Sequence, residues 1–163
     1  MINRAPSRLT LLAMLCGLTG TAHASGFFDD AKSDVLLRNF YLSNDYRSPT
    51  PSGKNYKQEW AQGFIGNFSS GFTEGTVGFG IDAHAFAGLK LDGGKGHSGT
   101  GLLPVDSDGR SEHDYSSAGG AFKLKVSRTT LAFGEMTVET PVFDTSDKRL
   151  QPEYATGFLL NSA

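Results

Sequence analysis

Long hydrophobic runs are missing from the 163-residue chain after its first two dozen residues, and the mean hydropathy is −0.27. A membrane-spanning helix needs about 20 apolar residues in succession, so this absence argues against a membrane protein built from helices. Charge of one sign is not in large excess either. The formal net charge of −2 gives no reason to expect a nucleic-acid partner.

Cysteine is almost absent. The single Cys16 lies in an N-terminal stretch that has the three parts of a signal peptide in order. Two arginines come first, a short apolar segment covers residues 9–18, and an A-x-A site occupies residues 22–24. An ordinary buried N-terminal helix is the competing interpretation.

We expect cleavage between Ala24 and Ser25, with residues 1–24 removed as a signal peptide and residues 25–163 exported. The exported part would contain no cysteine, which fits an oxidising compartment without disulfide bonds.

Glycine and phenylalanine are abundant instead, with 21 and 12 residues, a composition that suits a β protein. Apolar residues alternate with polar or small ones most clearly over residues 76–91. A strand of this length would measure about 50 Å, more than a tilted barrel strand needs to cross a membrane. The residues on its apolar face are Val77, Phe79, Ile81, Ala83, Ala85, Ala87, Leu89 and Leu91.

Further strands are expected in five other places. They cover residues 34–42, 60–68, 118–126, a segment around 131–133, and a segment that begins near 155 and continues to 163. The first of them carries apolar residues on both faces, so its inward face is ambiguous. The connections alternate in length, being long at 43–57, 92–116 and 138–154 and short at 69–75 and 127–129. Long loops on one rim and short turns on the other are typical of bacterial outer-membrane barrels.

Several segments resemble the OprD family of substrate-selective porins, over essentially the whole chain after residue 24. They include EWAQGF at 59–64, SGFTEGTVGFG at 70–80, GLKLD at 88–92, GTGLLPV at 99–105, GEM at 134–136, LRNFY at 37–41 and SDKRLQP at 146–152. The resemblance implies an all-β, antiparallel up-and-down barrel of about 18 strands in the outer membrane. The present chain would supply about six N-terminal strands of it.

Passive, substrate-selective uptake of small carboxylate-bearing solutes follows from the same resemblance. The solutes implied are basic amino acids, small peptides or aromatic acids. Expected partners are outer-membrane lipid, these solutes, periplasmic chaperones and the barrel-assembly machinery.

Basic residues are the candidates for guiding carboxylates through the channel. Alternation places Lys90, Lys123 and Lys125 on the inward face if the apolar face contacts lipid. The resemblance adds Arg38 and Arg149, since arginine can hold a carboxylate with two hydrogen bonds. It also implies that residues 138–154 fold inward as a constriction loop marked by Val138, Pro141, Pro152 and Tyr154. Asp82 and His84 also face inward, where we expect them to screen neighbouring charges.

No catalytic residue, metal ligand or cofactor site is predicted. Residues 94–99 match G-x-G-x-x-G, but no helical pattern follows, so a dinucleotide site is not expected. The acidic cluster at 106–114 lacks the spacing of a calcium loop, and the histidines lack zinc-site spacing. The alternatives to a porin are a soluble periplasmic β-barrel or sandwich that binds a ligand, an enzyme on a β scaffold, a barrel without transport and a non-functional truncated fragment.

Overall fold

The fold is taken from a computed structural model that describes residues 25–48, 53, 55–93 and 96–162. The predicted signal peptide, including Ala24, lies outside these residues. Ser25 begins a single short helix, α1 (Ser25–Asp29). Among the described residues, no helix is long and apolar enough to cross a membrane.

Six strands form one antiparallel sheet, and each strand pairs with its neighbour in sequence. The strands are β1 (Lys32–Asp45), β2 (Tyr56–Ser69), β3 (Val77–Asp92), β4 (Asp114–Val126), β5 (Thr129–Met136) and β6 (Ala155–Ser162). The predicted all-β, up-and-down order is therefore confirmed.

Three of the long strands exceed the bounds that their sequence pattern predicts, and β2 does so by beginning at Tyr56 rather than at residue 60. β1 continues through the polar residues 43–45, and β4 begins at Asp114, within the segment expected to be a loop. Both extensions pair residue by residue with a neighbouring long strand, for example Asp114 with Leu89. The backbone ladder extends these strands where side-chain alternation gives no signal, because ladder hydrogen bonds do not depend on side-chain polarity.

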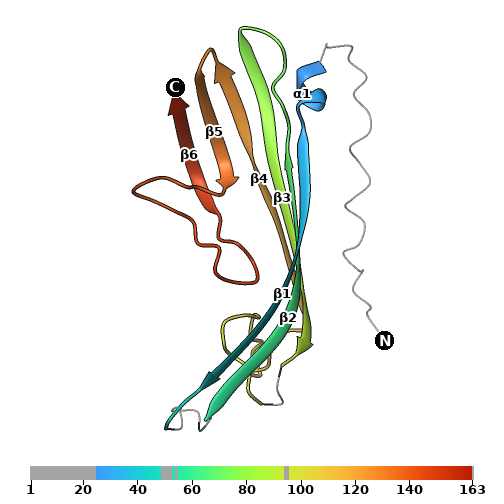
Figure 1. The fold of residues 1–163 in the computed structure, drawn as a ribbon, viewed down its shortest axis with the longest axis vertical. Helices are drawn as coiled ribbons and strands as arrows, with labels where there is room; N and C mark the ends of the chain where they lie inside the picture. Colours follow the sequence, from blue (N-terminus) through green and yellow to red (C-terminus); the bar gives the residue numbers. More distant parts are fainter. Residues whose placement is uncertain (1–24, 49–52, 54, 94–95, 163) are drawn as a thin grey trace, which may run out of the picture.

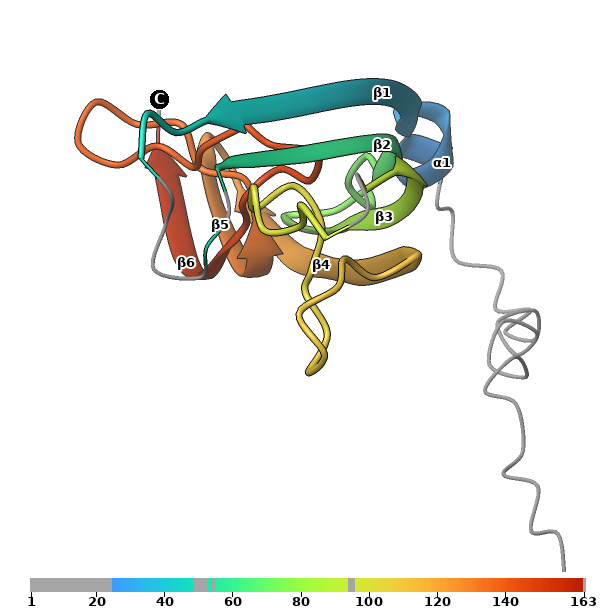
Figure 2. The same ribbon diagram turned by 90° about the horizontal axis from the view of Figure 1, so that it is seen from below.

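The sheet curls into half a barrel, which is visible as an open curve when the molecule is seen end-on (Figure 2). Its convex face carries large apolar side chains that are exposed, among them Phe122 at 70%, Phe158 at 75% and Leu160 at 67%. An apolar face of this extent is what a surface in contact with lipid requires. Tyr41 and Trp60 pair across β1 and β2 on the same convex face, and the Trp60 indole N–H donates to Asn39 Oδ1 at 2.8 Å. Such aromatic residues mark the membrane interface in barrels.

The two rims of the sheet differ as the sequence predicts. The short β2–β3 and β4–β5 turns lie at one end with α1, while the β1–β2 and β3–β4 loops lie at the other (Figure 1). β5 and β6 have only eight residues each, against 13–16 in the other strands. The loop between them, residues 137–154, therefore starts partway down the sheet and lies on its concave side (Figure 1).

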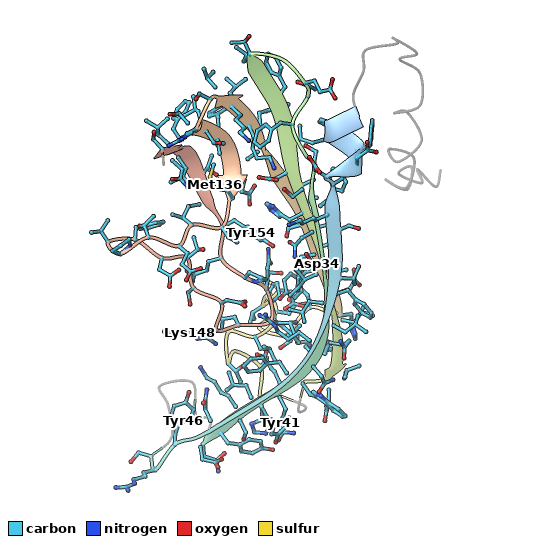
Figure 3. All side chains as sticks on the ribbon, turned by 45° about the horizontal axis from the view of Figure 1, so that its top comes forward. Asp34, Tyr41, Tyr46, Met136, Lys148 and Tyr154 are labelled. Carbon is cyan, nitrogen blue, oxygen red and sulfur yellow. The ribbon has the colours of Figure 1, made fainter. Side chains whose placement is uncertain are left out.

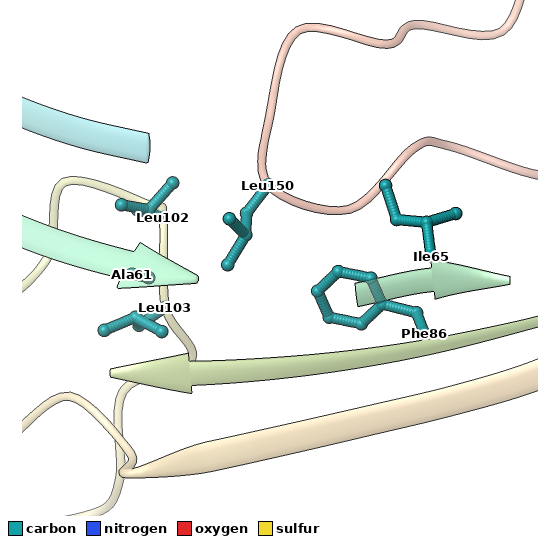
Figure 4. Close-up of a cluster of buried hydrophobic side chains, with 6 residues drawn as sticks. All are labelled: Ala61, Ile65, Phe86, Leu102, Leu103 and Leu150. Atoms are coloured by element: carbon teal, nitrogen blue, oxygen red, sulfur yellow. The ribbon is translucent and has the colours of Figure 1, made fainter. Parts of the chain in front are cut away.

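The buried apolar cluster joins the loops to the concave face of the sheet. It consists of Ala61, Ile65, Phe86, Leu102, Leu103 and Leu150 (Figure 4). Three of these residues come from β2 and β3, two come from the β3–β4 loop, and Leu150 comes from the loop 137–154. Leu150 is fully buried, and a Cβ on Gly63 would lie 3.2 Å from its side chain. The small residue at position 63 thus makes room for the loop to dock.

Replacing Leu150 with alanine should loosen the loop 137–154 while leaving the sheet intact. Removing a buried leucine side chain costs about 2–5 kcal/mol, and here that loss falls on loop docking. Limited proteolysis of unboiled membranes should show faster cleavage within residues 137–154. Val142→Ala is the matched control, because Val142 is 95% exposed and should leave the cleavage rate unchanged.

Candidate functional site

The concave face of the half-barrel collects the charged side chains of the strands. The register places Arg38 opposite Gly63, Ile65 opposite Phe86, and Lys123 opposite Gly80. These positions share a face with the buried cluster that holds the loops, so they point into the half-barrel. The inward face of β1, ambiguous in the sequence, is thereby decided: Arg38 lies on the concave side.

Arg38 clamps the loop 137–154. Its Nη1 and Nη2 donate to the two carboxylate oxygens of Asp147 at 2.6 and 2.8 Å, and Nη1 also donates to the Arg149 carbonyl at 2.6 Å. The Arg38 side chain is largely buried, at 17% exposed. This two-pronged hydrogen bond holds the pKa of Asp147 below its ordinary value, against a smaller opposing effect of burial.

Arg149 connects that loop to the β3–β4 loop. Its Nη1 donates to the Thr100 carbonyl at 3.1 Å. Arg38 on β1 binds the backbone of residue 149 in the loop 137–154, and Arg149 binds the backbone of residue 100 in the β3–β4 loop. The two guanidinium groups therefore link β1 to the first loop and the first loop to the second.

Glu59 is a buried anchor that sequence reasoning missed. Its carboxylate accepts from the backbone N–H groups of Gly99 and Thr100 at 3.1 Å and of Leu102 at 3.3 Å. The hydroxyl groups of Thr100 and Ser111 also donate to it. A glutamate among small inward-facing strand residues is the one signal that could have flagged this position, but the donors are about 40 residues or more away in sequence.

Two lysines also help to hold the β3–β4 loop. Lys90 Nζ donates to the Ser111 carbonyl at 2.7 Å, and Lys57 Nζ donates to the Gly99 carbonyl at 3.1 Å. Lys90 lies on the concave face opposite Ala61, as alternation predicts. The hydrogen bond to Ser111 ties the Lys90 side chain to the backbone of the β3–β4 loop.

Lys123 and Lys125 lie near the opposite rim, where the short turns are. Lys123 Nζ is 2.6 Å from Asp82 Oδ1, an ion pair without hydrogen-bond alignment, and donates to Ser69 Oγ at 2.8 Å. Lys125 is exposed and faces the ring of Phe72 at 5.3 Å. The two neighbouring lysines therefore have different surroundings.

His84 contacts the last residue of the loop 137–154 and a residue of β5, the strand that precedes this loop. Its ring stacks on Tyr154 with ring centroids 3.6 Å apart, and its Nε2 is 3.6 Å from Glu135 Oε1. Gly134, whose φ is +133°, comes just before Glu135 at the end of β5. Burial, together with the carboxylates of Asp147 and Glu135, raises the pKa of the Tyr154 phenol.

The residues predicted to mark the constriction loop occupy different parts of it. Val138 pairs with Thr145, whose N–H donates to its carbonyl at 2.8 Å, and Pro141 lies exposed near the loop tip. Pro152 and Tyr154 line a recess of about 650 Å³ together with Arg38. Figure 3 shows Tyr154 and Lys148 on the concave side of the sheet.

In the described part of the chain, no group of three His, Cys, Asp or Glu side chains is placed to hold a metal ion. Two residues of the G-x-G-x-x-G match, at positions 94 and 95, lie outside the described residues.

The sequence matches the profile of the outer membrane porins of the OprD family over residues 25–163. The chain belongs to the OprD family. It is therefore an outer-membrane protein, since the porins of this family are found in the outer membrane of Gram-negative bacteria.

Curated relatives of this OprD-family chain come from pseudomonads. Porin D of Pseudomonas aeruginosa is 49% identical over 142 residues, which are 87% of this chain and 31% of Porin D. The porin-like protein GalP of Pseudomonas putida is 44% identical over 150 residues, or 92% of this chain and 36% of GalP. The chain thus spans about a third of the length of these two relatives, one a porin and the other a porin-like protein.

Solved structures of the OprD family share the fold. OccK9 (OpdG) of Pseudomonas aeruginosa superposes with a TM-score of 0.79 at 42% identity, over 85% of this chain and 35% of OccK9. A BenF-like porin from Pseudomonas fluorescens gives 0.77 at 42% identity, over 84% and 35%. OpdK of Pseudomonas aeruginosa, solved with vanillate, gives 0.73 at 44% identity, over 85% and 34%.

In this OprD-family chain, the ion pair of Asp147 with Arg38 should stabilise the loop at neutral pH. The pKa of Asp147 is depressed below 3.8, so the contribution is complete above that pH and is lost as pH falls through the lower folded-state value. Asp147→Asn should lower the unfolding temperature of the protein by about 2–4 °C at neutral pH. This temperature is measured on a gel, as the temperature at which the band of the folded protein is replaced by the band of the denatured protein.

The difference in unfolding temperature between Asp147→Asn and the parent protein should shrink when the same measurement is made at about pH 3. Asp144→Asn is the matched control, as Asp144 lies on the same loop without an ion pair to Arg38. A pH-independent difference would contradict this assignment.

Proposed function

We propose that this chain forms the first six strands of an outer-membrane channel through which small carboxylate-bearing solutes diffuse passively and selectively. The observation that supports it best is the arrangement of charge. Four of the five predicted basic residues, all but Arg149, lie on the concave face of strands whose convex face is apolar and exposed. Arg149 joins them from the loop that covers that face.

Carboxylates are the solute class that this arrangement favours. Cations near a narrow passage attract anions, and several weak positions let a solute enter and still leave. The related OpdK was solved with vanillate, an aromatic carboxylate, and it aligns with 85% of this chain. Basic amino acids and small peptides also carry the carboxylate that these cations would contact.

The passage would be narrowed by the loop 137–154. That loop is fixed at the wall by Arg38, at the apolar cluster by Leu150, and at its base by the stacking of Tyr154 on His84. A recess of about 650 Å³ remains between the loop and β1. Pockets that accept small molecules fall in the range of about 300–1,000 Å³.

A soluble ligand-binding β-barrel is the second candidate, and the exposed convex face argues against it. Monomeric soluble proteins rarely expose a contiguous apolar patch of more than a few hundred Å². Here large apolar residues are exposed on the convex face of all six strands, including Leu37, Phe64, Phe79, Phe122, Phe133 and Phe158. Lipid is the partner that such a face fits. Periplasmic chaperones and the barrel-assembly machinery would follow as further partners.

An antibody against residues 92–116 tests whether the chain forms part of a barrel. Outer-membrane fractions should show a band far larger than 17.4 kDa that changes mobility on boiling, because folded barrels resist detergent until heated. A soluble band at or below 17.4 kDa would be incompatible with the proposal.

Replacing both Lys123 and Lys125 with glutamine should slow carboxylate uptake more than neutral-solute uptake. Two charges lining the passage are lost, and each is worth on the order of 1 kcal/mol to an anion in contact with it in water, or about fivefold. Liposome swelling with benzoate and with glycerol gives the two rates. Arg47→Gln, which removes an exposed charge just beyond the end of β1, should change neither. An equal loss for both solutes would reject the guidance role.

A further inference from the structure

We propose that Phe72 is a positioning residue for a carboxylate-binding subsite at the short-turn rim, and that Lys125 supplies the ammonium group that contacts the solute. The inference rests on the proposed channel function and deepens it. It assigns the two neighbouring lysines different tasks and adds an aromatic residue that is absent from the predicted basic row.

The β2–β3 turn folds back over the concave face of β3 and is held there by several hydrogen bonds. The N–H of Ser70 donates to the Ile81 carbonyl and that of Thr73 to the Phe79 carbonyl, each at 2.9 Å. Thr73 Oγ1 in turn accepts from the N–H of Phe79 at 2.9 Å. Residue 72 lies between these two attachment points, so its backbone is fixed.

Contacts with α1 and β3 fix the turn from both sides. The N–H of Gly71 donates to the Phe27 carbonyl at 3.0 Å, and a Cβ at Gly71 would clash with the Gly26 carbonyl oxygen. On the other side, a Cβ at Gly78 would come within 3.1 Å of Phe72 Cβ. The Phe72 side chain therefore lies over a glycine of the strand, on the same face as the lysines, because Gly78 pairs with Lys125.

The Phe72 ring attracts both ammonium groups. Lys123 Nζ lies 5.4 Å and Lys125 Nζ 5.3 Å from its centroid, within the distance of about 6 Å at which a cation interacts with an aromatic face. The two lysines are two residues apart on β4, so they point to the same side of the sheet, where both ammonium groups reach the ring.

The two lysines differ in the partners that they already have. Lys123 lies 2.6 Å from Asp82 Oδ1 and donates to Ser69 Oγ and to the Ser70 carbonyl. For Lys125, the contact found among the described residues is with the Phe72 ring, and its side chain is exposed. An ammonium group has three N–H donors, and a ring face uses none of them in an aligned hydrogen bond to oxygen. Lys125 can therefore still donate to a solute carboxylate.

The recess around Lys125 contains carboxylates that would otherwise compete for it. It measures about 980 Å³, and its lining includes Asp29 and Asp30 together with both lysines and Phe72. A lysine side chain has four rotatable bonds and could turn toward these acidic groups. Attraction to the fixed ring opposes that movement and keeps the ammonium available to the solute.

The test measures benzoate flux against benzoate concentration in proteoliposomes that contain the complete pore of which these six strands are part. Glycerol flux is the neutral reference. Phe72→Leu should raise the half-saturating benzoate concentration about two- to fivefold, the range expected for loss of a cation–ring contact, with glycerol flux unchanged. Phe72→Tyr keeps the aromatic face and should restore the parent value. A comparable drop in glycerol flux would show a merely structural role and overturn the proposal.

Double variants separate the two lysines. In a Lys125→Gln background, Phe72→Leu should have no further effect, whereas in a Lys123→Gln background it should keep its full effect. An unchanged effect of Phe72→Leu in the Lys125→Gln background would overturn the assignment. If Phe72→Leu does not assemble, a ring-fluorinated phenylalanine at position 72 keeps the shape and weakens the cation–ring attraction, and an unchanged half-saturation there would overturn the proposal equally.

Failure of this inference can be told apart from failure of the proposed function. If Lys125→Gln raises the half-saturating benzoate concentration and no Phe72 variant does, carboxylate guidance stands and the role of Phe72 is wrong. If glutamine at both lysine positions leaves benzoate and glycerol fluxes unchanged, the proposed function fails together with the subsite.

Discussion

The structure depends on the rule that a strand in lipid must pair its backbone groups and present mainly apolar side chains outward. Each of the six strands therefore hydrogen-bonds to its neighbours in sequence, and each contributes apolar residues to the convex face. On β4 the rule produces direct alternation: Phe122 and Leu124 face outward, while Lys123 and Lys125 face inward. Charge thus gathers on the concave face because the other side cannot accept it.

Gathering charge on one face creates a second problem, since cations and carboxylates there pair with each other. Much of the concave charge holds the structure together. Arg38 donates hydrogen bonds to Asp147 and to the backbone of the loop 137–154. Lys90 donates to a carbonyl of the β3–β4 loop, and Lys123 forms an ion pair with Asp82. Counting basic residues therefore overstates how many are available to a solute.

The loops over the concave face are linked to each other and to the sheet by hydrogen bonds. Glu59 gathers donors from the β3–β4 loop, Arg149 joins that loop to the loop 137–154, and Arg38 returns the connection to β1. A buried carboxylate with its donors in place fixes a unique arrangement, but it becomes a costly unpaired charge if those donors are lost. The shape of the proposed passage thus depends on residues that no solute needs to touch.

The sequence by itself determined the all-β class, the order of the strands, the contrast between long loops and short turns, and the inward face of Lys90, Lys123 and Lys125. Those features follow from period-two alternation and from spacing, which are local properties of the chain. Only the tertiary structure decided the face of Arg38, the extra length of β1, β2 and β4, the anchoring role of Glu59 and the position of Phe72 beside two lysines. Each of these depends on a partner distant in sequence: Asp147 lies 109 residues from Arg38, and Ser111 lies 52 residues from Glu59. Alternation tells which side of a strand a residue occupies, but only the folded chain brings its partner to that side.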